Sequence, residues 1–155
     1  MYLPYVIVQN LKSKSKLKHM ETLTKTKNNV QIVQQAFADF GSGNIQGIID
    51  ECTDDIVWGA YENQDVPFAG SFKGKEGVRE FFRAIAENVD YSLFEPKEFF
   101  SDRDAVIVLG RHAGKVKKTN KTYDHDWCMV FRFRDKKLYS FFAFVDSLEQ
   151  AESFK

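Results

Sequence analysis

The chain has 155 residues, of which 43% are hydrophobic and 15% aromatic, and its formal net charge at pH 7 is zero. This length suits one domain with a real core, because such a domain buries about 70% of its unfolded surface on folding. The neutral charge argues against nucleic-acid binding, which needs a basic face to contact phosphates.

The basic residues gather at the N-terminus. Residues 1–27 hold six Lys and one Glu, which leaves 16 basic and 21 acidic residues from Asn28 onward. The apolar run near residue 1 precedes the charges, the reverse of a secretory signal, and it is too short to span a bilayer. We therefore predict a basic leader or arm over residues 1–27, with an upstream or non-native leader over residues 1–19, a domain over residues 28–155, and no membrane association.

Apolar residues at helical spacing predict three helices in the first half of the domain. The first begins near Asn28 and ends at Gly41-Ser42-Gly43, with an apolar face formed by Val30, Val33, Phe37 and Phe40. A short second helix follows from Ile45 to Cys52. The third spans residues 75–88, and its apolar positions are Val78, Phe81, Phe82 and Ile85. A strand at residues 56–61 and a loop at residues 62–74 separate the second helix from the third.

The second half of the domain reads as long strands joined by short polar turns. The strands are predicted at residues 91–100, 105–116, 122–134 and 138–146, followed by a closing helical turn at residues 147–154. Turns this short are typical of antiparallel hairpins. The sequence therefore predicts an α+β domain, in which a curved antiparallel sheet wraps around the N-terminal helices and leaves a cavity between the two layers.

The last two strands are largely apolar on both faces. One face can line the cavity, while the other needs a cover, most simply the same sheet of a second copy in a homodimer. The chain holds 15 Phe, which could fill a core or line a site for an apolar ligand. The two cysteines, Cys52 and Cys128, lie far apart and are interpreted as reduced, structural residues of a cytoplasmic protein.

Alternation along residues 122–133 places one titratable ring, His125, on an apolar face. The residues on this face are Tyr123, His125, Trp127, Met129, Phe131 and Phe133. Two interpretations of His125 stay open, a core histidine with one hydrogen bond or an acid/base group. The same holds for Asp146, which shares a face with Phe142 and Phe144: its carboxyl either faces the cavity with a raised pKa or caps the helix that begins at Ser147.

Several strings in this order resemble the nuclear transport factor 2-like superfamily, specifically its SnoaL-like, ketosteroid isomerase-related branch. They are residues 37–44 (FADFGSGN), 53–58 (TDDIVW), 72–78 (FKGKEGV), 131–138 (FRFRDKKL) and 144–146 (FVD). Together they span about residues 29–150. The resemblance implies a cone-shaped α+β barrel, usually dimeric, with a pocket inside the cone.

The resemblance also implies candidate chemistry. Asp146 matches the proposed acid/base of SnoaL-like polyketide cyclases. The three ketosteroid isomerase positions fall on Ala60, Ala36 and Met129, which cannot carry that chemistry. Arg111 corresponds to an arginine of limonene epoxide hydrolase, but one aspartate of that set falls near Ala113, so epoxide hydrolysis is disfavoured.

The sequence thus predicts a small-molecule-binding protein of the SnoaL-like kind, with isomerase or cyclase-type acid/base chemistry on a largely apolar substrate. The predicted catalytic residues are Asp146 and His125, and the predicted binding residues are Trp58, Ala60, Arg111, Trp127, Met129 and Phe144. The partner is a small apolar or aromatic molecule in the cone interior, without cofactor or metal. Two alternatives stay open, a non-enzymatic ligand-binding module and a dimeric interaction domain.

Overall fold

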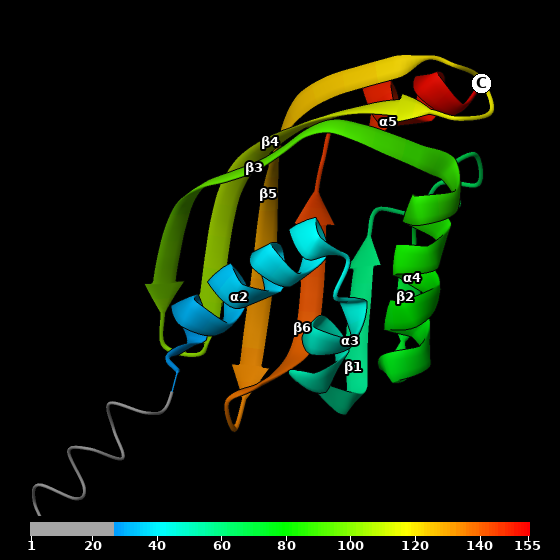
Figure 1. Cartoon of the computed structure of the whole chain (residues 1–155). Coiled ribbons are helices and arrows are strands. Elements are labelled where there is room, and N and C mark those ends of the chain that lie inside the picture. Colours follow the sequence, from blue (N-terminus) through cyan, green and yellow to red (C-terminus); the bar gives the residue numbers. More distant parts are fainter. Residues whose placement is uncertain (1–26) are drawn as a thin grey trace, which may run out of the picture.

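The computed structural model describes residues 27–155 (Figure 1), and the predicted arm falls almost entirely outside the described residues. Within these residues the helices are α2 (Asn29–Ser42), α3 (Ile45–Asp50), α4 (Gly74–Asn88) and α5 (Ser147–Phe154). The strands are β1 (Cys52–Ala60), β2 (Ser71–Lys73), β3 (Val89–Asp102), β4 (Ala105–Val116), β5 (Thr122–Arg134) and β6 (Lys137–Phe144).

Local sequence signals fix both ends of α2. Asn28 forms a capping box, in which its side chain accepts from the Gln31 amide at 2.9 Å and its own amide donates to the Gln31 side chain at 3.0 Å. Gly43 ends the helix with a φ of 75°, a left-handed conformation that costs glycine little. Between these ends Ile32, Val33 and other apolar side chains turn toward the sheet.

The six strands form one sheet in the order β2-β1-β6-β5-β4-β3. The pairs from β3 to β6 are antiparallel, as predicted, but β1 pairs with β6 in parallel, with Trp58 opposite Phe141. Other details also differ from prediction: β1 begins at Cys52 rather than at residue 56, β6 ends at Phe144 rather than at residue 146, and the predicted loop contains β2, which pairs with β1.

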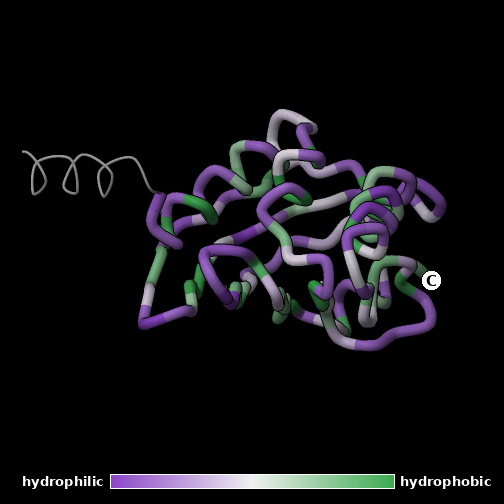
Figure 2. The backbone as a smooth tube through the Cα atoms, turned by 90° about the horizontal axis from the view of Figure 1, so that it is seen from below, coloured by the Kyte–Doolittle hydropathy of each residue, from purple (hydrophilic) through white to green (hydrophobic). Residues whose placement is uncertain are grey.

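The sheet curves, and α2, α3 and α4 lie on its concave side, while α5 lies at one end beside the strands (Figure 1). The sheet is not closed, since β2 and β3 are its two edges. Figure 2 shows hydrophobic and hydrophilic residues interspersed along the chain, as expected when each element buries one face. These observations confirm the predicted α+β fold, with N-terminal helices packed against a curved sheet.

Strict alternation along β4 and β5 separates an inner face from an outer face. Val106, Val108 and His112 of β4 are buried on the inner face. Ile107 and Leu109 of the same strand are exposed on the outer face. Which face a residue occupies therefore decides whether it can contact a molecule inside the cone.

Candidate functional site

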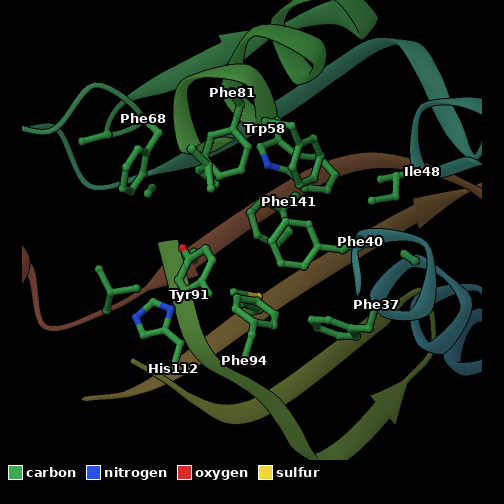
Figure 3. A pocket seen from close by; sticks show the side chains of 18 of the residues that line it. Phe37, Phe40, Ile48, Trp58, Phe68, Phe81, Tyr91, Phe94, His112 and Phe141 are labelled. Atoms are coloured by element: carbon green, nitrogen blue, oxygen red, sulfur yellow. The ribbon is translucent and has the colours of Figure 1, made fainter. Parts of the chain in front are cut away.

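An apolar cavity lies between the helices and the inner face of the sheet (Figure 3). Its volume, counted as space for the centre of a water molecule, is about 80 Å³, enough for several waters or one compact organic molecule. No Asp, Glu, Lys or Arg within residues 27–155 lines it. Most of its wall is aromatic and comes from Phe37, Phe40, Trp58, Phe68, Phe81, Phe82, Tyr91, Phe94, Phe131 and Phe141.

Four polar side chains also line this cavity: Tyr61, Tyr91, His112 and Gln150. The Tyr61 hydroxyl donates to the Gln150 side-chain oxygen at 2.7 Å. Burial raises the pKa of Tyr61 to about 12, helped by the nearby Tyr123 and Asp146. Burial also raises the pKa of Tyr91 well above its ordinary value. Both phenols are therefore neutral at pH 7.

His112 enters this wall because of the residues that flank it on β4. The register places Gly110 opposite Trp127, His112 opposite His125, and Gly114 opposite Tyr123. The indole of Trp127 fills the space beside Gly110, and a Cβ on Gly114 would lie 2.8 Å from the Tyr123 hydroxyl oxygen. Each glycine thus gives room to a large ring from β5.

Between these two rings the imidazoles of His112 and His125 meet, with their Nε2 atoms 3.3 Å apart. The ring centroids are separated by 4.4 Å and the planes are inclined by 72°. His112 is 2% exposed. Burial and, to a lesser extent, the neighbouring His125 lower its pKa to about 3, against a small opposing effect of Asp124. His112 is therefore neutral at pH 7, and the polar part of the cavity carries no charge.

Three of the predicted binding residues, Trp58, Ala60 and Met129, line the cavity. Trp127 is buried on the same inner face but does not line it, because its indole packs behind Phe37 and Phe94, with centroids at 5.9 and 5.5 Å. Trp127 therefore packs against the aromatic residues of the wall without contacting the cavity itself.

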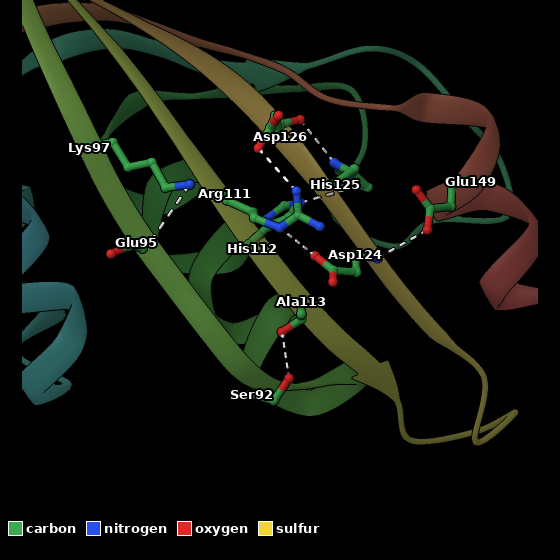
Figure 4. Close-up of polar contacts among 10 residues, drawn as sticks. All are labelled: Ser92, Glu95, Lys97, Arg111, His112, Ala113, Asp124, His125, Asp126 and Glu149. Carbon is green, nitrogen blue, oxygen red and sulfur yellow. Dashed lines mark hydrogen bonds and ion pairs between the residues drawn. The ribbon is translucent and has the colours of Figure 1, made fainter.

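Arg111 and Phe144 lie on the outer face, which corrects both predictions. Arg111 is next to His112 in β4 and so points the opposite way, where it pairs with Asp124 at 2.9 Å and Asp126 at 3.5 Å (Figure 4). Phe144 is 55% exposed. On β6 it is Ala143, not Phe144, that lines the cavity.

The two predicted catalytic residues lie apart from each other. Asp146 is exposed, and its carboxylate accepts from the Glu149 amide at 2.9 Å as the N-cap of α5. His125 is buried behind His112, and its Nδ1 lies 3.1 Å from the Asp126 carbonyl oxygen. Neither residue lines the cavity, and they share no hydrogen bond or ion pair in the described part of the chain.

The cavity residue that sequence reasoning missed is His112. Within residues 27–155, no three His, Cys, Asp or Glu side chains are grouped so that they could hold a metal ion. The available signal was the pattern Gly-x-His-x-Gly at residues 110–114, in which the histidine shares one strand face with two glycines. In the same described range, none of the helices has the length and apolar character needed to cross a membrane.

Comparison with known proteins gives a consistent assignment of fold. The family model for the SnoaL-like domain matches residues 33–141. A nuclear transport factor 2-like protein from Burkholderia xenovorans LB400 is 32% identical over 82% of this chain and 95% of its own, with a TM-score of 0.75. A second such protein, from Burkholderia thailandensis E264, is 25% identical over 84% and 99% of the two chains, with a TM-score of 0.76.

A more distant structure is a protein with a ketosteroid isomerase-like fold from Catenulispora acidiphila DSM 44928, in complex with trimethylamine. It is 12% identical over 77% of this chain and 88% of its own, with a TM-score of 0.65, which shows a shared fold alone. Among curated proteins, none matches the chain.

Proposed function

Because the chain belongs to the SnoaL-like domain family of the nuclear transport factor 2-like superfamily, we propose that it binds a small, uncharged, largely apolar or aromatic molecule inside the cone. The observation that carries this proposal is the aromatic cavity with neutral polar groups in its wall. A charged ligand would lose its hydration without meeting an opposite charge, which costs several kcal/mol. An aromatic ligand would instead gain contacts with the ring faces and edges around it.

The proposal is tested by filling the cavity from β6. Ala143 lines the cavity and is 6% exposed, so its replacement by leucine and then phenylalanine places progressively more atoms where the ligand would lie. With toluene as the probe, we expect affinity to fall at least about tenfold in Ala143→Phe, with a smaller loss in Ala143→Leu. Calorimetric titration gives the dissociation constants, and circular dichroism verifies the fold.

The matched control is Phe144→Ala, at the next residue of the same strand but on the outer face. It should leave toluene affinity unchanged. The proposal fails if toluene does not bind the unmodified protein, or if the Ala143 variants bind it as well as the unmodified protein does.

A second candidate function is an isomerase or cyclase-type enzyme that moves a proton on the bound molecule. The observation in its favour is the contact between His112 in the cavity wall and His125 behind it. Asp146 fits this role less well, because its exposed carboxylate already caps α5. Chemical turnover of a bound ligand separates the two functions, since a binding module returns its ligand unchanged.

We also propose that the chain forms a homodimer through the outer face of the sheet, in the cytoplasm, where the free cysteines Cys52 and Cys128 would stay reduced. Large apolar side chains exposed on this face include Ile107, Leu109, Phe142 and Phe144. We expect sedimentation equilibrium to give twice the mass of one chain, and Phe144→Glu to give the monomer mass. A monomeric unmodified protein would contradict the dimer without affecting the proposed binding function.

A further inference from the structure

The hydrogen positions on the two paired histidines follow from a single carbonyl group. Nδ1 of His125 lies 3.1 Å from the carbonyl oxygen of Asp126, and a carbonyl oxygen can only accept a hydrogen bond. His125 therefore carries its hydrogen on Nδ1. In the neutral ring, Nε2 is then an acceptor.

This assignment passes to His112 through the contact between the two Nε2 atoms at 3.3 Å. Because Nε2 of His125 accepts, Nε2 of His112 must donate, and the neutral His112 ring is left with a bare lone pair on Nδ1. That Nδ1 atom is buried and has no hydrogen-bond partner among the described residues. A buried acceptor without a partner costs about 1–3 kcal/mol, so a ligand that donates a hydrogen bond to this atom removes that cost.

We propose that the molecule bound in the cavity carries a hydrogen-bond donor, a phenolic, enolic or alcoholic hydroxyl, which donates to Nδ1 of His112. The inference rests on the proposed binding function and adds the polarity of the ligand to it. His112 lines the cavity directly, and the ring of Tyr91 lies beside it with centroids 5.7 Å apart. The hydroxyl would sit at this polar part of the wall, with the apolar body of the ligand against the phenylalanines.

The carbonyl of Asp126 thus sets the hydrogen positions on both imidazole rings, and these positions determine that the ligand must offer a donor to His112. His125 is a positioning residue, because it reaches the ligand only through His112 and fixes which nitrogen of His112 is bare. At Nδ1 of His112, a ligand that offers only an acceptor, such as an ether or a ketone, would place one lone pair against another and could not form this hydrogen bond. A carboxylate would do the same and would also bring an unpaired charge into the cavity.

The tautomers can be measured directly on the unmodified protein. Two-bond proton–nitrogen correlation spectra at pH 8 should show His112 protonated on Nε2 and bare on Nδ1, with the opposite pattern for His125. Addition of phenol should shift the Nδ1 signal of His112 toward the hydrogen-bonded range, whereas toluene should not. A hydrogen on Nδ1 of His112, or an Nδ1 signal that phenol leaves in place, would overturn the inference.

The second test compares phenol with toluene, two probes of similar size that differ in the hydroxyl. In His112→Phe, the affinity ratio of phenol to toluene should fall about tenfold relative to the unmodified protein. Met129→Leu, which changes another lining residue without a nitrogen acceptor, should keep the ratio. An unchanged ratio in His112→Phe overturns the inference, whereas failure of the unmodified protein to bind toluene overturns the proposed function instead.

Discussion

Replacement of Gly110 by alanine is expected to lower the free energy of unfolding by about 3 kcal/mol, at the upper end of what overpacking a core costs. A Cβ at this position would overlap the indole of Trp127 and would lie 2.5 Å from the backbone oxygen of Glu95. Neither neighbour can yield easily. The indole packs against the rings of both Phe37 and Phe94, and the Glu95 carbonyl belongs to the adjacent strand β3.

Urea denaturation followed by circular dichroism measures this change. The matched control is Gly41→Ala in α2, where a Cβ would meet nothing within 4 Å. Alanine favours a helix over glycine, so this control should be neutral or more stable by up to about 1 kcal/mol. Equal stability of the two variants would show that Trp127 does not depend on the space beside Gly110.

Most of the fold could be predicted because its signals are local. The Asn28 cap and the Gly43 terminus define α2, and the alternation within β4 and β5 is continuous over both strands. The parallel pairing of β1 with β6 has no such signal, because it joins segments separated by the whole meander. The short strand β2 was missed for a similar reason, since its three residues follow a loop and form a strand only through pairing with β1.

The site was harder to predict because an error of one residue in a strand reverses the face. The alternation correctly placed Met129 inside the cone. On β6 it was read with the wrong parity, so that Phe144 was assigned to the cavity in place of Ala143. Arg111 was assigned to the cavity because it corresponds to an arginine of a related family, whereas its side chain lies on the outer face. The contact between His112 and His125 depends on the register between β4 and β5, which the sequence of a single strand does not reveal.

Acidification from pH 7.5 to pH 5 is expected to remove about 2 kcal/mol of stability through His112 alone. Its pKa is about 3 in the folded protein against an ordinary value of 6.5. Below pH 6.5 the unfolded chain takes up a proton that the folded chain does not, so acid favours unfolding. This contribution to stability is present in full above pH 6.5, falls as the pH drops, and is lost completely only near pH 3.

The comparison of variants isolates this effect, because His112 is packed against groups that remain neutral or are shared by all variants. Tyr91 and Tyr123 pack against it from β3 and β5 with raised pKa values, His125 faces it from β5, and Asp124 lies on the outer face.

In His112→Phe, the loss of unfolding free energy between pH 7.5 and pH 5 should shrink by about 2 kcal/mol, as measured by urea denaturation at both values. Phe144→Ala should retain the full loss. If His112→Phe loses as much stability as the unmodified protein, the His112 ring accepts a proton inside the fold, and the cavity wall is then not the uncharged surface on which the proposed ligand class depends.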